Sequence, residues 1–183
     1  MIKAIIWDVG GVLIDDPEYK EFWKGVLGSE NLRISFGQGL IDTKEFIYQG
    51  AKLTNLSQKE FLKKYKMAYW KGKRNLELIK LFKNNGLKNY IFSDTNPIHL
   101  QYLEKIGQDL FKNAEKIFVN KRKKYSESYI EVLKIIKLNA REIIFVDNKR
   151  EYVKLARKQG INSILYKNNF QLKQSFKKYG LKI

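Results

Sequence analysis

The sequence contains no cysteine, which excludes disulfide bonds and thiolate metal ligands. His99 is its only histidine, so a bound metal would rely on oxygen ligands or on that one imidazole. No Pro/Gly-rich linker, low-complexity tract or internal repeat divides the chain. The apolar N-terminal run is interrupted at Asp8, too early for a signal peptide or a membrane span. These absences predict a cytoplasmic protein without membrane insertion.

Acidic residues are also scarce, with 19 Asp and Glu against 36 Lys and Arg, and the net charge is +17. Such a charge attracts polyanions, so some nonspecific affinity for nucleic acid is expected. The basic residues are mostly Lys and lie along the whole chain. Readout of base edges depends on bidentate Arg. A solvated basic surface is therefore favoured over dedicated nucleic-acid binding.

The chain has 183 residues, of which 44% are hydrophobic, enough for a substantial core. Short apolar runs with strand character alternate with helical patterns. The runs are Ala4 to Trp7, Tyr90 to Phe92, Ile117 to Val119, Ile143 to Val146 and Ile161 to Tyr166. The helices between them are Leu76 to Phe82, one from Pro97, Ser128 to Lys137 and Tyr152 to Gln159. This order predicts an α/β fold: a Rossmann-like parallel sheet with helices on both faces.

Residues 15–75 depart from this alternation, because no strand pattern is present there. Two capping-box sequences, starting at Asp42 and Ser57 with Glu three residues later, lead into amphipathic runs. We expect a small helical insert over 15–75, placed after the first strand, and a core formed by 1–14 and 76–183.

Polar residues follow the strands at the edge where α/β sheets bind ligands. Asp8 follows the first strand, Ser93 follows the second, a basic stretch with Lys123 follows the third, and Asp147 follows the fourth. Transfer of a phosphoryl group to a carboxylate uses these residue types. Mg²⁺ offsets the repulsion between the two anions, while a hydroxyl and an ammonium hold the phosphate oxygens.

In their order and spacing these residues resemble the four motifs of the haloacid dehalogenase-like hydrolases. The motifs are Asp8-x-x-Gly11-Val12-Leu13, Ser93 with Thr95-Asn96, a Lys about thirty residues later, and Asp147-Asn148 followed by Gly160. The resemblance covers nearly the whole chain, and the insert is similar to that family's helical cap. It implies a Mg²⁺-dependent phosphatase of a small phosphorylated metabolite.

The resemblance also implies a role for individual residues. Asp8 would be the nucleophile and a metal ligand, and Gly10 would offer its main-chain carbonyl to the metal. Ser93 and Lys123 would bind the phosphoryl group, with Lys124 as an alternative to Lys123. The remaining expected substrate contacts are Gly11, Asp94 and Thr95. The remaining expected metal ligands are Asp147 and Asn148.

The chain departs from the family pattern in three places, one of which is the third motif, where the Lys-Pro-Asp-like segment reads Lys123-Lys124-Tyr125. The other two affect the chemistry directly. The position that usually holds an acidic general acid/base is Gly10, and the usual metal carboxylate of the fourth motif is Asn148. A missing general acid lowers a rate by about 10² to 10⁴. An amide in place of a carboxylate removes a negative charge opposite Mg²⁺, so either Asp147 takes over as the ligand or Mg²⁺ binding is weak. Two alternatives therefore stay open: a catalytically degenerate binding or regulatory protein, and a metal-independent dehalogenase.

Overall fold

The computed structural model describes residues 1–15, 17–70, 72–106, 108–119 and 125–181. Its centre is a five-stranded sheet in the order β5-β4-β1-β6-β7. The strands are β1 (Ala4–Trp7), β4 (Lys88–Ser93), β5 (Lys116–Val119), β6 (Ile143–Asp147) and β7 (Asn162–Leu165). Every pairing between them is parallel. The predicted Rossmann-like fold class is confirmed, and each predicted strand forms within two residues of its expected bounds.

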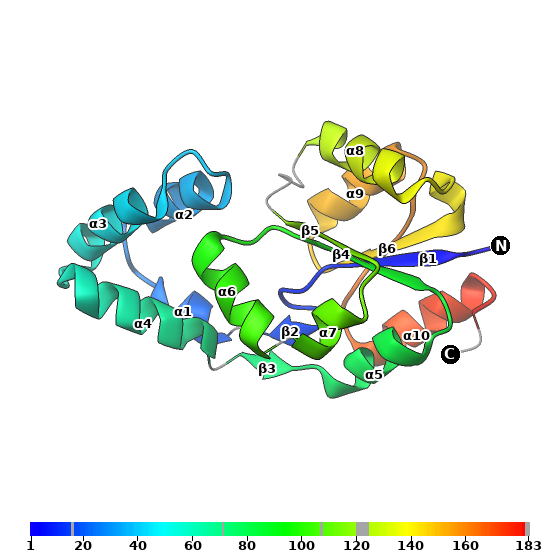
Figure 1. Cartoon of the computed structure of the whole chain (residues 1–183), viewed down its shortest axis with the longest axis horizontal. Helices are drawn as coiled ribbons and strands as arrows, with labels where there is room; N and C mark the ends of the chain where they lie inside the picture. Colours follow the sequence, from blue (N-terminus) through cyan, green and yellow to red (C-terminus); the bar gives the residue numbers. More distant parts are fainter. Residues whose placement is uncertain (16, 71, 107, 120–124, 182–183) are drawn as a thin grey trace.

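Helices cover both faces of this sheet (Figure 1). On one face lie α5 (Leu76–Asn84), α7 (Gln108–Lys112) and α10 (Asn169–Lys178), and on the other lie α8 (Ser126–Ile136) and α9 (Arg150–Lys158). The 3-10 turn η1 (Ala140–Glu142) leads into β6. Alternation along β1 explains the two layers, since Ile5 and Trp7 join the first core while Ala4 and Ile6 join the second.

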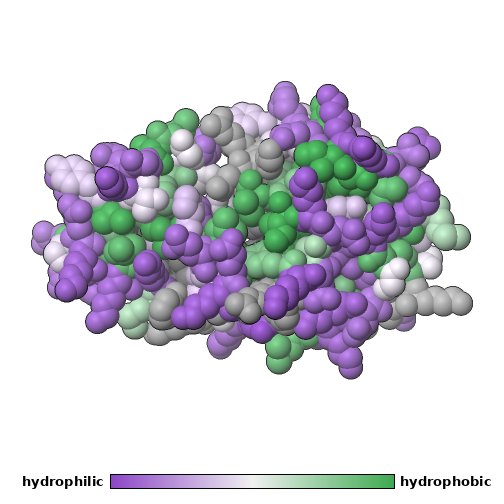
Figure 2. Space-filling view, in the orientation of Figure 1, coloured by the Kyte–Doolittle hydropathy of each residue, from purple (hydrophilic) through white to green (hydrophobic). Residues whose placement is uncertain are grey.

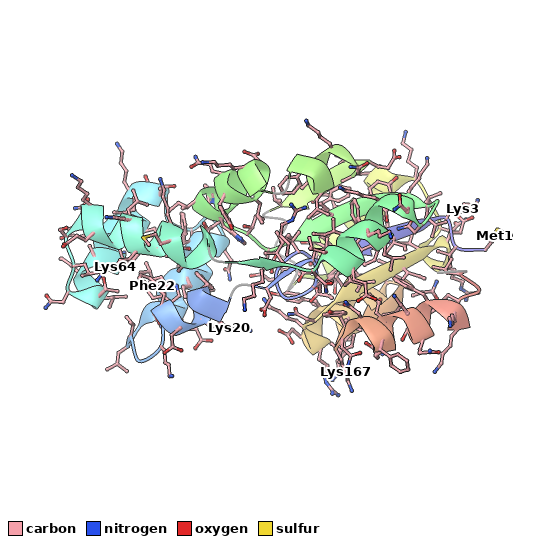
Figure 3. The ribbon with its side chains drawn as sticks, turned by 90° about the horizontal axis from the view of Figure 1, so that it is seen from below. Met1, Lys3, Lys20, Phe22, Lys64 and Lys167 are labelled. Atoms are coloured by element: carbon pink, nitrogen blue, oxygen red, sulfur yellow. The ribbon has the colours of Figure 1, made fainter. Side chains whose placement is uncertain are left out.

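The helical insert forms a second unit beside the sheet (Figure 1). Its helices are α1 (Pro17–Phe22), α2 (Ser29–Gly37), α3 (Thr43–Thr54) and α4 (Gln58–Trp70). In Figure 3 Phe22 and Lys64 lie in this unit, far from Lys3 and Lys167 in the sheet domain. The core of the insert is mainly aromatic: Trp23, Phe36, Phe46, Phe61 and Tyr65. We call the insert the cap.

The helix α6 (Pro97–Ile106) connects the cap to the sheet domain. Ile98 and Tyr102 on this helix are buried in the aromatic core of the cap, whereas Leu103 is buried in the core beneath the sheet. The loop that precedes α6 is the one that follows β4. The loop after β4 therefore leads directly into the helix that packs against the cap.

One detail of the prediction for 15–75 is wrong, because this stretch does contain a strand. The residue pairs Ile14–Asp15 (β2) and Lys73–Arg74 (β3) form a short antiparallel ribbon. Each strand is only two residues long, so no alternating pattern is visible in the sequence. The ribbon brings together the points where the chain leaves and re-enters the sheet domain.

Both predicted helix starts are capped, and the full reciprocal capping box is seen at Ser57 and Glu60. The Asp42 side chain accepts a hydrogen bond from Glu45 N at 2.8 Å and caps α3. Ser57 and Glu60 cap α4 reciprocally: Ser57 N donates to Glu60 Oε2 at 3.1 Å, and Glu60 N donates to Ser57 Oγ at 3.3 Å. Local sequence thus sets where both long cap helices begin.

The packing of α3 on α4 depends on Gly50. A methyl group at Gly50 would overlap the ring of Phe61, which is fully buried and cannot move aside. We expect Gly50→Ala to lower the free energy of unfolding by about 1 to 3 kcal/mol, the usual cost of overpacking a core. Urea unfolding followed by circular dichroism measures this change.

Gly37→Ala is the matched control for that substitution. Gly37 is also helical, but no atom lies within 4 Å of the position where its Cβ would be. Alanine favours a helix over glycine by up to about 1 kcal/mol, so this variant should be as stable as the wild type or more so. Equal destabilisation by both substitutions would contradict the proposed role of the Gly50–Phe61 contact.

The surface is dominated by hydrophilic residues (Figure 2). Hydrophobic atoms are visible over α8, where Ile130 and Ile135 are exposed. Among the described residues, no helix combines the length and the apolar character needed to cross a membrane.

Candidate active site

Three aspartates lie at the carboxyl edge of the sheet, on its α8/α9 face. Every second side chain of each strand faces these two helices: Ala4 and Ile6, Tyr90 and Phe92, and Ile143 and Phe145 are all buried in that core. Two residues further along the three strands, the same face is reached by Asp8, Asp94 and Asp147. The strands β4, β1 and β6 are neighbours in that order. Asp8 therefore occupies the middle position, between the segments that carry the other two.

Asp8 follows the central strand and is 6% exposed. Its N–H donates to Val146 O at 2.9 Å, which fixes its backbone beside β6. The chain then turns sharply, with Leu13 N and Ile14 N both donating to Val9 O at 3.0 and 2.9 Å. This turn holds the Asp8 carboxylate at the end of the sheet.

Gly10 and Gly11 in this turn serve different purposes. Gly11 has φ +77, and a side chain there would overlap the amide of Asn148. Gly10 lies outside the positive-φ region, and among the described residues no atom beyond its chain neighbours is within 4 Å of the position where its Cβ would be. The positive φ and the nearby Asn148 amide thus explain why glycine occupies position 11. Neither constraint applies at Gly10.

Asp147 is completely buried at the end of β6. Its Oδ1 accepts a hydrogen bond from Lys149 N at 2.8 Å, which orients the carboxylate. The next residue, Asn148, is exposed, and its amide lies against Gly11. The first and fourth motifs are therefore in direct contact.

In the loop after β4, Thr95 and Asn96 are buried and hydrogen-bonded, whereas Asp94 is exposed. Ser93 and Thr95 are each 3% exposed. Thr95 Oγ1 and His99 Nδ1 are 2.9 Å apart, and His99 N donates to Asn96 Oδ1 at 2.9 Å. Asn96 Nδ2 donates to Tyr65 Oη at 3.0 Å, which links this loop to the cap.

The only histidine supports this loop as a neutral residue. Burial lowers the pKa of His99 to about 3. The ring is therefore uncharged at neutral pH and cannot act as an imidazolium acid there. His99 is best described as a structural support for Thr95 and Asn96.

Two tyrosines at the site were missed in the sequence analysis. Tyr129 on α8 is 1% exposed, and its hydroxyl donates to Tyr152 O at 3.2 Å. Burial raises the pKa of Tyr129, and the nearby negative charges of Asp147, Asp94 and Asp8 raise this pKa further. Tyr129 belongs to the same buried cluster as Ile6, Phe92 and Phe145, and each of these precedes one of the three aspartates by two residues.

Tyr152 on α9 is in contact with Asp94. Burial raises the pKa of Tyr152, and so do the charge of Asp94 and a hydrogen bond to its side chain. Lys149 Nζ lies 4.8 Å from the centre of the Tyr152 ring. In the sequence both tyrosines look like ordinary core positions of amphipathic helices, so no signal pointed to the site.

Several of the predicted site residues have no described structure. Lys123 and its alternative Lys124 lie outside the described residues, together with the rest of the segment 120–124. Of the described ones, Gly10 and Gly11 lie in the turn after Asp8, and Ser93, Asp94 and Thr95 lie in the loop after β4. Asp147 and Asn148 lie beside the same turn. The catalytic, substrate-binding and metal-binding roles expected for all of them stay predictions.

A metal site made only of acidic and imidazole side chains is absent from the described part of the chain, where no group of three or more His, Asp or Glu residues could hold an ion. The expected site instead has two carboxylates, Asp8 and Asp147, on neighbouring strands. Mg²⁺ commonly binds one or two carboxylates and keeps waters or phosphate oxygens as its other ligands. The donor set at this edge therefore fits Mg²⁺.

An open cavity of about 560 Å³ lies to one side of the site, between the starts of α5 and α10. It is lined by polar side chains that bond to each other. Asn75 Nδ2 donates to Asn169 Oδ1 at 2.9 Å and to Val12 O at 3.2 Å. Through these hydrogen bonds the cluster connects the first motif to the start of α5. The side-chain amides of Asn75 and Asn169 are hydrogen-bonded to one another.

Comparison with known proteins identifies the fold. No protein-family model matches the sequence, and no curated protein matches it. Solved structures do match over nearly the whole chain. A predicted HAD-like family hydrolase from Porphyromonas gingivalis aligns with a TM-score of 0.79 and 17% identity, covering 98% of each chain. A HAD family enzyme from Bacteroides thetaiotaomicron aligns with a TM-score of 0.74 and 21% identity, covering 96% of this chain and 98% of that one.

A third match is a dehalogenase. The L-2-haloacid dehalogenase from Xanthobacter autotrophicus, with chloropropionic acid covalently bound, aligns with a TM-score of 0.67 and 16% identity. It covers all of this chain and 85% of the dehalogenase. Together the matches show that this chain has the haloacid dehalogenase-like fold, as the motif resemblance implies. Similarity at this level of identity concerns the fold, and function must be argued from the site.

Proposed function

We propose that the protein is a hydrolase of the haloacid dehalogenase-like type, a Mg²⁺-dependent phosphatase that acts through an aspartyl-phosphate intermediate. The observation that carries this proposal is the position of Asp8. It is a buried carboxylate at the end of the central strand, with Asp147 on the next strand and Asp94 in the loop on the other side. The expected substrate is a small phosphorylated metabolite.

A cation is needed where these carboxylates meet, because a phosphate substrate adds more negative charge. Asp8 and Asp147, with the Gly10 carbonyl and Asn148, are the groups that would hold Mg²⁺ here. When bound, Mg²⁺ would neutralise charge on the phosphate and on Asp8. A Bacteroides thetaiotaomicron HAD family enzyme has been crystallised with magnesium and inorganic phosphate; it aligns with a TM-score of 0.70 and 22% identity.

The protein side chains would carry out two displacements. In the first, the Asp8 carboxylate attacks phosphorus and the bond to the leaving oxygen breaks. In the second, water attacks the phosphoryl group on Asp8 and releases inorganic phosphate. Ser93 and Lys123 would hold the phosphate oxygens in both steps. Gly10 supplies no proton to the leaving group, so a leaving group that is stable as an anion is favoured.

The dehalogenase alternative uses an equivalent nucleophile but needs no cation. In a dehalogenase a second carboxylate could activate water to hydrolyse the ester formed on Asp8, so the presence of Asp147 is compatible with both activities. The assay below decides between them. The degenerate alternative predicts phosphate binding without turnover.

A direct assay separates the three alternatives. We expect the wild type to release phosphate from an activated aryl phosphate when Mg²⁺ is present, and to lose this activity when Mg²⁺ is removed with EDTA. It should release no halide from 2-chloropropionate. Halide release without Mg²⁺ would identify a dehalogenase, and absence of both activities would favour the binding protein.

We propose that the protein acts in the cytoplasm and that its partner is a small molecule. The net charge of +17 adds a nonspecific affinity for nucleic acid that high salt should remove.

A further inference from the structure

The hydrogen bond between Tyr152 and Asp94 spans the end of β1. Tyr152 belongs to α9, which follows β6, whereas Asp94 follows β4. In the sheet β1 lies between β4 and β6. Neighbouring strands are about 4.8 Å apart, so the two residues come from segments on either side of Asp8. Their contact therefore lies over the α8/α9 side of the carboxyl end of β1, where Asp8 is located.

The three carboxylates differ in their access to water. Asp147 is 0% exposed, and one of its oxygens accepts a hydrogen bond from the Lys149 amide. Asp8 is nearly buried, at 6% exposure. Asp94 is exposed. Of the three, Asp94 is the one that can exchange a proton with solvent while it remains close to Asp8.

The contacts of Tyr152 hold its hydroxyl in place to orient the Asp94 carboxylate. Its ring is half-buried against the core under α9 and is covered by Lys149 Nζ at 4.8 Å. Its backbone carbonyl accepts from the Tyr129 hydroxyl at 3.2 Å, and Tyr129 itself is buried. The raised pKa of Tyr152 keeps its hydroxyl protonated, so it serves as a donor to the Asp94 carboxylate and not as a base.

We propose that Asp94 is the general base for hydrolysis of the aspartyl-phosphate, and that Tyr152 is its positioning residue. The proposal rests on the proposed function. An acidic side chain at Gly10 would protonate the leaving group in the first step and accept a proton from water in the second, and only the second of these roles is assigned to Asp94. A water oxygen bonds to phosphorus as the bond between phosphorus and the Asp8 oxygen breaks. The water gives one proton to the Asp94 carboxylate, and Asp8 leaves as a carboxylate. Asp94 then releases the proton to solvent.

The two half-reactions can be measured separately with an activated aryl phosphate in a stopped-flow experiment with Mg²⁺. The first turnover reports formation of the phosphoenzyme, and the steady state reports its hydrolysis. For Asp94→Asn we expect the burst rate to stay within about threefold of the wild type, while the steady-state rate falls by about 10² to 10⁴, the usual contribution of a general base. Phosphoenzyme should accumulate in this variant.

Tyr152→Phe removes the orienting hydroxyl and leaves Asp94 in place. We expect a smaller loss in the steady-state rate, about tenfold, with an unchanged burst. A merely structural tyrosine would lower both phases together. Glu104→Gln, an exposed acidic residue on α6, is the control and should change neither phase.

Several outcomes would overturn the assignment. Unchanged steady-state turnover in Asp94→Asn would show that another group accepts the proton, and equal losses in both phases would show a role in binding or in the first step. If the wild type forms no phosphoenzyme, the proposed function itself fails and the role of Asp94 fails with it. A normal wild-type burst with an unaffected Asp94→Asn variant refutes only the present inference.

Discussion

Asp8→Asn is expected to lower turnover of an activated aryl phosphate by at least about 10³-fold, because the amide cannot form the covalent intermediate. The side chain keeps its size, and its buried position at the end of β1 can accommodate an amide. We therefore expect the fold and the thermal unfolding midpoint to be nearly unchanged. Wild-type protein quenched in acid during turnover should carry one phosphoryl group, detected by mass spectrometry on the peptide with Asp8.

Asp42→Asn provides the matched control for this change. Asp42 caps α3 in the cap through a hydrogen bond from Glu45 N, and asparagine is an equally good N-cap residue. This variant should have wild-type activity and stability. Turnover by Asp8→Asn at a rate close to the wild type, after contaminating phosphatase has been excluded, would remove Asp8 from the nucleophile's role.

The second large effect concerns the leaving group and follows from Gly10. Without a side chain to protonate the departing oxygen, the first step should depend steeply on the stability of that oxygen as an anion. Aryl, acyl and anomeric phosphates should therefore react faster than simple alkyl phosphates. The measurement is the single-turnover rate for a series of phosphate monoesters of graded leaving-group pKa.

Gly10→Asp should flatten this dependence. The backbone at Gly10 is not in the positive-φ region, and the described residues leave its Cβ position open, so they can accommodate an aspartate there. We expect rates for poor leaving groups to rise by up to about 10² to 10⁴, and rates for good leaving groups to change little. Equal slopes in the two proteins would mean that another residue already acts as the acid in the first step.

Gly11→Ala serves as the control for Gly10→Asp. Gly11 has φ +77 and lies against Asn148, so any side chain there is strained and displaces that amide. This neighbouring substitution should destabilise the protein and lower the activity with every substrate, without changing the slope. The contrast separates a gain of acid catalysis from a general disturbance of the turn.

Much of this fold can be predicted from local sequence, for identifiable physical reasons. The central strands are short apolar runs that only a sheet covered on both faces can bury, and the predicted and observed bounds of β1 are the same, Ala4–Trp7. The starts of α3 and α4 are determined by capping side chains within three residues. The apolar run Ala4–Trp7 is also sufficient to predict that Asp8 lies directly after β1.

Other features depend on contacts between residues far apart in the chain, and no local pattern reveals them. The β2–β3 ribbon pairs residues separated by the whole cap, and each strand is too short to show alternation. Tyr129 and Tyr152 follow a helical pattern that predicts only burial, whereas their positions beside Asp94 and Asp147 arise from the packing of α8 and α9 on the sheet. The sequence alone determined the strand order along the chain and the carboxylates that end the strands. The tertiary structure decided that Asp94 and Asp147 flank Asp8, because that depends on β1 pairing with both β4 and β6.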